Sequence, residues 1–510
     1  MSEGRPTRRT VLAGALGTGV ALGAASLLSG CGSAASDDRL RVAFAGGGSR
    51  ENLDPHVVLN YVDQARAKAC FDTLSCWSED MGAVPRLAES WEVDPTGTRW
   101  RIHLRDARFH DGRPLTPDDV LYTFRRIADP ATGATAAKLF TTVDLTASRA
   151  LGPRDVEVVL TAPNFLFPLA WAAPGAEIVP RGTTSFERPV GTGPFRWVSF
   201  SPGGPALYSA NPDHWGGAPP SRELEFVPVD EEQGRVGALL SGQVAYAFDL
   251  RASSAVSLGT DSRAKVLSAP GSASQFLYLR VDRPPFVDPR LREAVRLGLD
   301  RQALVRVVLL GKGQVGNDLF GQGAQYYDTA PPQVTRDVEQ ATALVAQAGA
   351  TGSRIELQTS TADPIYQAAA GVIAQQLGEI GLQVVPRTLP PDSYYATIRS
   401  QGVSSVSSVG SLPLPDYIGR RMVSSATARN FTGYRDPQID ALSAAAVATP
   451  NEADRVASYS RAQELIRASS GMLVWAAADM HVGIAADLGG VEVARPNTDR
   501  WARFDRARLG

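Results

Sequence analysis

The sequence predicts an α/β protein of two or three domains, one of which is rich in β-strands. The chain has 510 residues, which is more than a single hydrophobic core normally serves. In residues 100–105, apolar and polar side chains alternate with the period of a half-buried strand. From Val338 onward, helical and strand patterns alternate along the chain, an order that indicates a parallel crossover unit.

Composition and charge place the chain among globular proteins and disfavour some partners. Hydrophobic residues make up 44% of the sequence and the mean hydropathy is -0.12, as expected for globular domains. The formal net charge is -2, so nothing in the charge balance points to nucleic acid as a partner. The 48 glycines and 35 prolines are spread along the chain, and they indicate many turns rather than a low-complexity segment.

Residues 1–30 have the features of a signal peptide, and we leave them out of the fold prediction. Residues 7–12 (TRRTVL) resemble a twin-arginine motif, although two arginines also serve the general secretory path. An apolar run follows and ends at Leu28-Ser29-Gly30-Cys31, which resembles a lipobox. We therefore expect cleavage before Cys31, a lipid on its thiol and a tether over 31–39. The alternative is an uncleaved anchor, because the apolar run is nearly long enough to span a bilayer.

The first folded elements are a strand at 40–44 and a helix at 65–74, and the β-rich region follows them. Within that region, Asp111-Gly112 predicts a tight turn, because glycine adopts positive φ at no steric cost. Thr116 as N-cap, Pro117 in the first helical position and two acidic residues in the first turn predict a helix start. A further strand is expected at 156–160.

The segment 189–195 (PVGTGPF) carries two glycines and a proline close together, which requires a particular backbone path. It lacks the G-K-[ST] ending and the G-x-G-x-x-G frame, so we exclude a nucleotide site there. The segment 211–217 (NPDHWGG) predicts a rigid turn around a buried Trp215, with His214 as a structural residue and not a ligand.

The second half of the chain predicts a crossing segment at 267–272 and then the α/β unit. Asp288 caps a helix with Pro289 in its first turn, and Gly349 and Gly381 end two later helices. The other expected elements are a strand at 276–280, a helix ending near Gly311, helices at 338–348, 365–380 and 451–468, and strands at 355–357, 382–385 and 472–477.

Five groups of residues occur in the order of one known family. They are 84–124 (PRLAESWEV, WRIHLR, FHDGRPLTPDDV), 189–195, 211–217, 285–304 (PFVDPRLREA, LDRQAL) and 430–442 (NFTGY, PQIDAL). On these motifs the chain resembles the family 5 extracellular solute-binding proteins, which are the oligopeptide-, dipeptide- and nickel-binding receptors of ABC importers. The resemblance covers nearly all of residues 40–480.

The resemblance implies an α/β, two-lobed periplasmic-binding-protein fold of class II (Venus-flytrap) with an extra β-rich subdomain. Lobe I would comprise residues 40–75, 186–268 and 482–510. The subdomain would comprise 76–185, and lobe II would comprise 269–481.

The resemblance also implies a ligand site between the lobes. The family's aspartate, which pairs with the ammonium group of a peptide, matches Asp416 in the segment 411–417 (SLPLPDY); a solvated loop aspartate is the alternative. Pro413 and Pro415 cannot donate main-chain hydrogen bonds, and the usual aromatic residues upstream are missing. We therefore expect a pocket that differs from the standard peptide cleft.

The candidate wall residues are tyrosines, each with a place in the core as the alternative: Tyr417, Tyr394, Tyr395 and, in lobe I, Tyr61. Arg420 and Arg421 are candidates to meet a ligand carboxylate, or else they solvate a surface. The five histidines are scattered, with no pair at ligand spacing, so we expect no metal site and no cofactor.

Cys70 and Cys76 allow two interpretations. Outside the cytoplasm they can form a disulfide that closes a small loop. Alternatively, they are two small buried apolar residues.

The predicted function is that of a lipid-anchored receptor on the extracytoplasmic face of the cell membrane. It would act as a monomer, capture an oligopeptide or other peptide-like solute, and deliver it to ABC permease subunits. An oligosaccharide or a metal chelate is the alternative ligand, and a sensor without transport is the alternative role. The chain has no G-x-S-x-G, no H-E-x-x-H and no Cys/His motif, so an enzyme is not expected.

Overall fold

The computed structural model describes residues 38–58 and 60–510. The predicted signal peptide, the twin-arginine motif, the lipobox with Cys31 and most of the tether lie outside the described residues. Residues Asp38–Gly510 form one compact unit.

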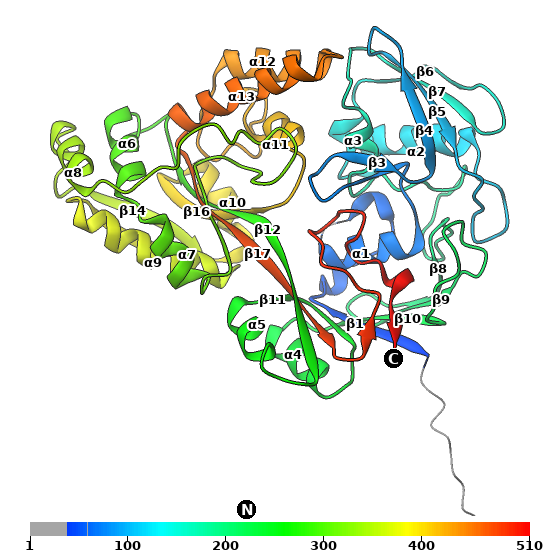
Figure 1. The fold of residues 1–510 in the computed structure, drawn as a ribbon. Helices are drawn as coiled ribbons and strands as arrows, with labels where there is room; N and C mark the ends of the chain where they lie inside the picture. The colour runs from blue at the N-terminus through cyan, green and yellow to red at the C-terminus, as the bar shows by residue number, and fades with distance from the viewer. Residues whose placement is uncertain (1–37, 59) are drawn as a thin grey trace, which may run out of the picture. The chain divides into compact units, whose positions relative to one another are not determined.

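The central element of this unit is a mixed sheet of eleven strands (Figure 1). Ten of its strands follow the order β15-β14-β16-β12-β17-β11-β1-β10-β9-β8, and β13 pairs with β17. Their bounds are β1 Arg39–Phe44, β8 Phe195–Phe200, β9 Ala206–Ala210, β10 Glu223–Pro228, β11 Tyr246–Leu250, β12 Ala264–Leu279, β13 Gly313–Val315, β14 Arg354–Ser360, β15 Gln383–Leu389, β16 Ser404–Gly410 and β17 Met472–Ala485.

The predicted parallel crossover unit is present at one end of this sheet. Strand β14 pairs in parallel with β15 and with β16. Helix α9 (Pro364–Glu379) connects β14 to β15, because a parallel pair needs a long connection. The helix ends where predicted, with Gly381 at a φ of 88°.

The β-rich region is a separate antiparallel sheet of four strands in the order β4-β5-β7-β6. Trp100, Ile102 and Leu104 on β5 are buried as the alternation predicts. Thr116 and Asp119 form a capping box at the start of α2 (Pro117–Ala128), with the Thr116 amide donating to Asp119 Oδ2 over 2.8 Å. The bounds of the strands are β4 Ala88–Val93, β5 Arg99–Leu104, β6 Val143–Ala150 and β7 Asp155–Leu160.

The remaining elements cover these sheets or connect them. The remaining helices are α1 Tyr61–Cys70, α3 Pro168–Trp171, α4 Glu232–Leu240, α5 Ala252–Leu258, α6 Pro289–Gly298, α7 Arg301–Val308, α8 Val338–Gln347, α10 Pro391–Ser400, α11 Leu414–Arg421, α12 Pro437–Ala448 and α13 Glu452–Ser469. Short 3-10 turns lie at Gly48–Arg50, Pro55–Val57, Pro130–Thr132, Ala137–Leu139 and Phe504–Arg506, and two small sheets pair β2 Ser75–Trp77 with β3 Ala83–Pro85 and β18 Leu488–Gly489 with β19 Arg508–Leu509. Of the helices described, none combines the length and apolar character needed to cross a membrane.

Three large hydrophobic cores define the parts of the molecule. We call the part around Phe44, Phe71 and Tyr208 lobe I. The part around Trp100 and the β4–β7 sheet is the subdomain. The part around Phe276, with α6 to α13, is lobe II. The exact domain boundaries given above stay predictions.

Lobe I and lobe II share two long strands. Strand β12 pairs with β17 from Ala264 to Tyr278 and with β16 in lobe II. The predicted crossing segment 267–272 therefore lies inside a strand, and only a register shift between Ala269 and Ala273 marks it. The prediction of a strand at 472–477 was too short, because β17 continues through the crossing to Ala485. Antiparallel pairing with β12 on both sides of the crossing, from Tyr278 with Met472 to Ala264 with Ala485, carries the strand through without a turn.

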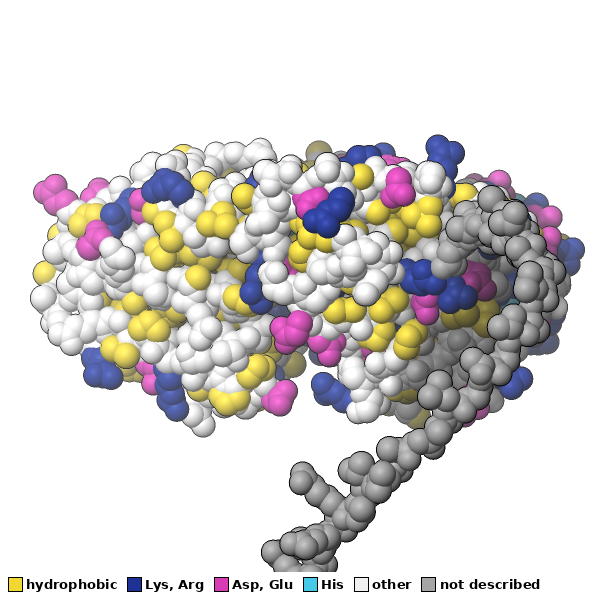
Figure 2. Space-filling model, turned by 90° about the horizontal axis from the view of Figure 1, so that it is seen from below, with side chains coloured by type: hydrophobic (Ala, Val, Ile, Leu, Met, Phe, Trp, Pro, Cys, Tyr) yellow, Lys and Arg dark blue, Asp and Glu magenta, His cyan; other side chains and the backbone are white. Residues whose placement is uncertain are grey.

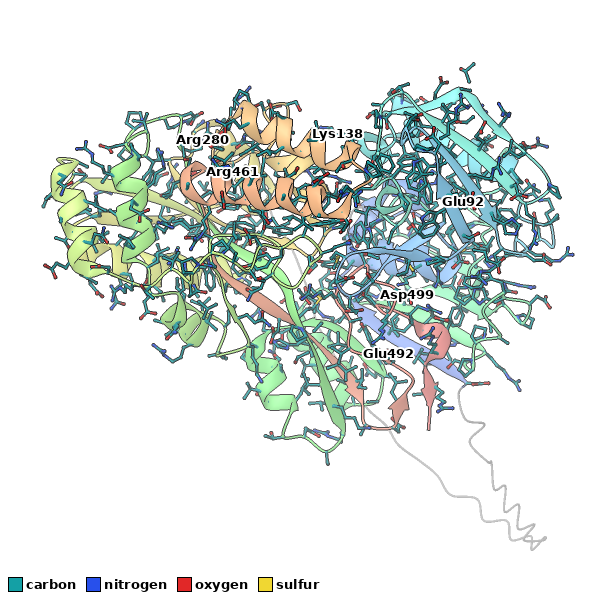
Figure 3. The ribbon with its side chains drawn as sticks, turned by 45° about the horizontal axis from the view of Figure 1, so that its top comes forward. Glu92, Lys138, Arg280, Arg461, Glu492 and Asp499 are labelled. Carbon is teal, nitrogen blue, oxygen red and sulfur yellow. The ribbon has the colours of Figure 1, made fainter. Side chains whose placement is uncertain are left out.

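Several motifs of the sequence meet at the carboxylate of Asp72. Arg86 donates to Asp72 Oδ1 over 2.9 Å, while Thr192 and Trp215 donate to Oδ2 over 3.0 and 2.9 Å. Asp499, from the C-terminal segment (Figure 3), accepts from Arg86 over 3.3 Å. Burial by itself raises the pKa of Asp72, but Arg86, His214 and Trp215 outweigh it and hold that pKa well below its usual value.

The glycines of the 189–195 segment are required by close backbone contact. A Cβ on Gly191 would lie 1.9 Å from the carbonyl oxygen of Cys70. The Gly193 amide donates to the same carbonyl over 3.0 Å. The segment therefore packs its backbone directly against the C-terminal end of α1. This is the particular backbone path that the two glycines predict. Cys70 and Cys76 are both buried and free, with no disulfide between them.

The surface mixes both signs of charge. On the face that Figure 2 shows, Lys and Arg side chains alternate with Asp and Glu side chains, and no continuous basic area is visible there. This distribution agrees with the net charge of -2.

Candidate functional site at the lobe junction

Several strands end, and several helices begin, at the junction between lobe I and lobe II. Strands β14 and β16 are parallel and end at Ser360 and Gly410. The helices α9 and α11 begin directly after these ends, at Pro364 and Leu414. In α/β sheets, ligands bind in the crevice beyond the carboxyl ends of the strands, so this edge is the candidate site.

Strands β12 and β17, which cross between the lobes, lie next to this candidate edge, at the point where the register of β12 shifts. The Gly271 amide donates to Asp479 Oδ1 over 3.2 Å. The Ser411 hydroxyl lies 3.2 Å from the Gly271 carbonyl and 3.0 Å from that of Ser272. The segment that leads into α11 is therefore tied to the crossing by its own side chain.

The two sides of the junction touch each other in this structure. The amide of Phe165 in the subdomain donates to the Val447 carbonyl of lobe II over 2.8 Å. Leu166 and Leu412 each pack against the lobe II core and also against a small cluster around Trp77. The arrangement is that of a clamp with its sides in contact.

Tyr61 lies at the junction from the side of lobe I. It is the first residue of α1, which Asn60 and Asp63 cap reciprocally. Its ring packs edge-on against Trp501 at a centroid distance of 5.9 Å. A Cβ added to Gly410 would lie 2.7 Å from the Tyr61 hydroxyl, so this hydroxyl faces the end of β16. Burial, together with Asp249, raises the pKa of Tyr61 well above its usual value.

Asp416 lies at the junction from the side of lobe II. It sits in the first turn of α11 rather than in a loop, because Pro413 and the residues after it are compatible with a helix start. Its side chain is only 11% exposed, and Arg420 Nε lies 2.5 Å from Oδ1. Burial raises the pKa of Asp416, although Arg420, Arg421 and Arg429 oppose that rise.

The structure places Tyr417 and Tyr394 in the lobe II core. The Tyr417 ring stacks on Phe320 at 3.8 Å, and its hydroxyl lies 2.8 Å from the Met472 sulfur. The Tyr394 hydroxyl donates to the main-chain carbonyls of Gln358 and Val406. Both side chains are buried. In this structure, Tyr417 and Tyr394 are therefore core residues and not wall residues of a pocket.

Tyr395, the neighbour of Tyr394, has the opposite environment. Its side chain is 42% exposed, and its hydroxyl lies 3.1 Å from that of Tyr366. It also contacts Phe431, with ring centroids 5.8 Å apart. Of the two adjacent tyrosines, Tyr395 is the one that reaches the surface.

Sequence reasoning missed an acidic pair at the junction. Asp249 lies in β11 of lobe I, one residue before the strand ends, with a φ of 56°, and Asp363 caps α9 in lobe II by accepting from the Ile365 amide over 2.9 Å. Burial raises the pKa of each, and Asp249 adds to the rise for Asp363. The Asp363-Pro364 dipeptide is a recognisable helix start, but no sequence signal brings Asp249 to it.

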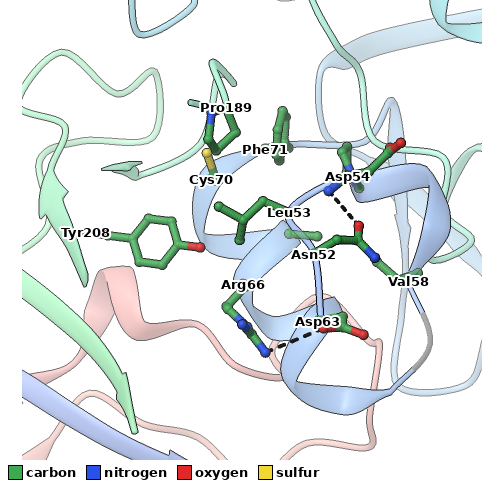
Figure 4. A pocket seen from close by; sticks show the side chains of 12 residues that line it. Asn52, Leu53, Asp54, Val58, Asp63, Arg66, Cys70, Phe71, Pro189 and Tyr208 are labelled. Atoms are coloured by element: carbon green, nitrogen blue, oxygen red, sulfur yellow. Dashed lines mark hydrogen bonds and ion pairs between the residues drawn. The ribbon is translucent and has the colours of Figure 1, made fainter. Parts of the chain in front are cut away.

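A cavity within lobe I is too small to be the solute site. It is lined by residues of α1 and its surroundings, among them Leu53, Arg66 and Tyr208 (Figure 4). Its volume is about 10 Å³, which is room for about one water molecule. Within residues 38–58 and 60–510, no three His, Cys, Asp or Glu side chains are arranged to hold a metal ion.

The chain is similar to one protein family and to several known binding proteins. The family model "Bacterial extracellular solute-binding proteins, family 5 Middle" matches residues 82–430. A probable di/tripeptide-binding protein 5 of Pseudomonas aeruginosa is 26% identical over 75% of this chain and 79% of its own length. The glutathione-binding protein GsiB of Escherichia coli is 25% identical over 88% of this chain and 90% of its own length.

A solved structure supports the fold. The periplasmic binding protein DppA of Helicobacter pylori, in complex with the peptide STSA, superposes with a TM-score of 0.77 at 20% identity. The match covers 92% of this chain and 98% of DppA. The two-lobed α/β fold and the family resemblance predicted from sequence are thereby confirmed. The chain belongs to the bacterial extracellular solute-binding proteins, family 5, and is a binding protein of a transport system and not an enzyme.

Proposed function

We propose that this protein captures a peptide-like solute between lobe I and lobe II and delivers it to the permease of an ABC importer. The observation that carries the proposal is the nearly buried carboxylate of Asp416, which lies where β16 ends and the crossing strands leave for lobe I. The names of the di/tripeptide-binding relative and of the peptide complex support a peptide-like solute.

In this proposal, Asp416 binds the ammonium group of the solute. Its Oδ1 is engaged by Arg420, and its Oδ2 is the atom that faces the solute. Tyr61 forms the wall on the opposite side, and the end of β16 offers main-chain groups for strand-like pairing with an extended peptide. Tyr417 and Tyr394 hold α11 and α10 from the core side without touching the solute.

We also propose that the mature protein is anchored by a lipid on Cys31 at the extracytoplasmic face of the membrane. Support comes from the lipobox and the signal-peptide pattern of the sequence. The anchor keeps the receptor, as a monomer, near its permease.

Thermal unfolding of a soluble form that begins at residue 32 tests the proposal. The panel holds di- to hexapeptides, their N-acetylated forms, oligosaccharides and nickel chelates. A ligand at a hundred times its dissociation constant adds about 2.7 kcal/mol of stability. Stabilisation by peptides that is lost on acetylation is the expected result, whereas stabilisation only by sugars or chelates would contradict a peptide-like solute.

A further inference from the structure

The C-terminal segment of lobe I reaches across the junction through one arginine. Arg495 follows Ala494, which packs against the lobe I core. Its guanidinium donates from Nε to the Pro270 carbonyl over 3.0 Å and from Nη2 to the Gln322 carbonyl over 3.3 Å. Pro270 belongs to the crossing strand β12, and Gln322 lies two residues after Phe320 of the lobe II core. One side chain of lobe I therefore holds both the crossing and a loop of lobe II.

Two glycines leave room for this guanidinium. Gly323, in the lobe II loop, has a φ of 78°, and a Cβ added there would lie 2.7 Å from Arg495 Nη2. Gly271, in the crossing, has a φ of 62°, and its added Cβ would lie 3.4 Å from the same atom. Positive φ at both places favours glycine. The planar guanidinium, with its N–H groups in a fixed fork, suits the two carbonyls that these turns present.

The turn between β2 and β3 holds the main chain of Arg495 in this position. Glu79 accepts from the Arg495 amide over 3.4 Å and from the Thr498 hydroxyl over 2.8 Å. The neighbouring Asp80 carbonyl accepts from the Gln325 amide of the lobe II loop over 2.6 Å. Burial lowers the pKa of Arg495, and the two acidic side chains oppose that change. The same turn therefore supports Arg495 and contacts the loop that Arg495 holds.

This loop of lobe II also packs against the helix that carries Asp416. Phe320 stacks on Tyr417 of α11, with ring centroids 3.8 Å apart. A Cβ added to Gly321 would lie 3.8 Å from the side chain of the first residue of α11. Because the loop and α11 are packed together, a movement of the loop away from lobe I would carry Asp416 with it.

We propose that Arg495 is a latch that stabilises the closed arrangement of the two lobes and thereby slows release of the solute. Opening about the crossing separates Gln322 from the C-terminal segment and breaks its hydrogen bond to Arg495, whereas Pro270 stays at the crossing. Arg495 is thus a positioning residue, which acts on the solute through the loop and α11. The effect on the solute rests on the proposed function, but lobe closure is measurable without a solute.

Small-angle scattering and stopped-flow binding test the latch in the soluble form that begins at residue 32. Without added peptide, R495Q should have a larger radius of gyration than the wild type. With Ala-Ala-Ala and with Gln-Ala-Ala, dissociation should accelerate about tenfold and by the same factor, because a hydrogen bond from a charged group corresponds to at least about tenfold in an equilibrium constant. Association should stay within about twofold, since such changes act mostly on dissociation.

Matched variants separate the latch from local effects of the substitutions. R500Q changes an exposed arginine of the same segment, which pairs with Glu492 over 3.4 Å, and should behave as the wild type does. G323A keeps Arg495 but places a methyl group against its guanidinium, so it should behave like R495Q. G352A introduces alanine at a φ of 75° with no atom within 4 Å of the new methyl group. It has the same backbone strain as G323A and should leave closure and release unchanged.

Two further variants assign the effect to this contact. R495Q/G323A should be no more open than R495Q, because both changes remove the same interaction and their effects do not add. R495K should recover part of the closure, since an ammonium group still donates to one of the carbonyls.

The outcomes separate the latch from the proposed function. A radius of gyration or a release rate in R495Q equal to that in R500Q would overturn the latch. An effect on release that differs between the two peptides would also overturn it, because Arg495 would then contact the solute. If neither peptide binds, the proposed function fails, and scattering still decides the latch: a larger radius in R495Q and G323A supports it, and an unchanged radius overturns it.

Discussion

Arg420 donates to Asp416 across one turn of α11, with Nε 2.5 Å from Oδ1. The pair is mostly shielded from water, since the Asp416 side chain is 11% exposed and that of Arg420 is 24% exposed. A solute that approaches Asp416 therefore meets a carboxylate that already has one cationic partner. The ammonium group of the solute must share this carboxylate with Arg420 or displace Arg420 from it.

Replacing Asp416 with asparagine should weaken binding of a peptide with a free ammonium group. The variant keeps the shape of the side chain but removes the charge, and loss of one partner from a buried charge pair costs about 2–5 kcal/mol. Titration calorimetry measures the change. The control Asp213→Asn alters a 76% exposed partner of Arg196 far from the junction and should bind as the wild type does. An unchanged dissociation constant in Asp416→Asn would remove Asp416 from the site.

Replacing Gly410 with alanine should push the two lobes apart. The added Cβ would lie 2.7 Å from the Tyr61 hydroxyl, and overpacking of this kind costs about 1–3 kcal/mol. We expect a larger radius of gyration in small-angle scattering and weaker solute binding.

The double variant Gly410→Ala/Tyr61→Phe tests the cause of that effect. Phenylalanine lacks the hydroxyl that the new methyl group meets, so closure should be largely restored. If the double variant behaves like Gly410→Ala alone, then contact with Tyr61 is not what the methyl group disturbs.

Replacing Asp72 with asparagine should destabilise lobe I and the subdomain together. Arg86, Thr192 and Trp215 all donate to this carboxylate, and breaking a buried pair costs about 3–5 kcal/mol. Because folding lowers the pKa of Asp72 below its usual value of 3.8, its stabilisation is present at neutral pH and is lost as the pH falls through the folded-state pKa. Thermal midpoints at pH 7 and pH 3 measure both effects, and a loss in Asp72→Asn no larger than in Asp213→Asn would contradict the central role of Asp72.

Replacing Glu177 with glutamine should stabilise the protein at alkaline pH. Burial raises the pKa of Glu177 from 4.5 to about 8, although the Gly175 amide donates to its carboxyl group. The folded state therefore holds a proton that the unfolded state has lost, and wild-type stability falls as the pH rises from about 4.5 to about 8. Since each pKa unit corresponds to about 1.4 kcal/mol, the loss is on the order of a few kcal/mol.

Denaturation midpoints at pH 5 and pH 9 check this expectation. Glu177→Gln should match the wild type at pH 5 and exceed it at pH 9. The control is Glu187→Gln, which changes an exposed glutamate and should follow the wild type at both values. A variant that loses the same stability as the wild type between pH 5 and pH 9 would show that Glu177 is ionised in the folded protein.

Local patterns predicted much of the secondary structure. The capping box of Thr116 and Asp119, the Asp288-Pro289 helix start and the stop at Gly381 all form where expected. Each depends on a few neighbouring residues whose backbone preferences or hydrogen bonds act within one turn. The strand at 100–105 likewise follows from alternation, since one face of the subdomain sheet is buried.

The candidate site was less predictable, and the two adjacent tyrosines show why. Tyr394 and Tyr395 look equivalent in the sequence, yet the first bonds to main-chain carbonyls of the core and the second is 42% exposed. Which side of α10 faces β14 depends on packing and not on the residues themselves. The same holds for Asp249 and Asp363, which come from different lobes and have no shared pattern.

By itself, the sequence determined the family, the α/β class, several of the places where helices begin or end, and the need for glycine at Gly191 and Gly193. These features rest on interactions between close neighbours or on motifs that keep their order. The helix predicted at 65–74 instead spans Tyr61–Cys70, and the expected loop around Asp416 is helical. Only the tertiary structure decided that Arg86, Thr192 and Trp215 meet at Asp72 and that β12 and β17 run unbroken between the lobes. These features depend on which surfaces meet once the chain has folded, and burial and charge act there between residues far apart in the sequence.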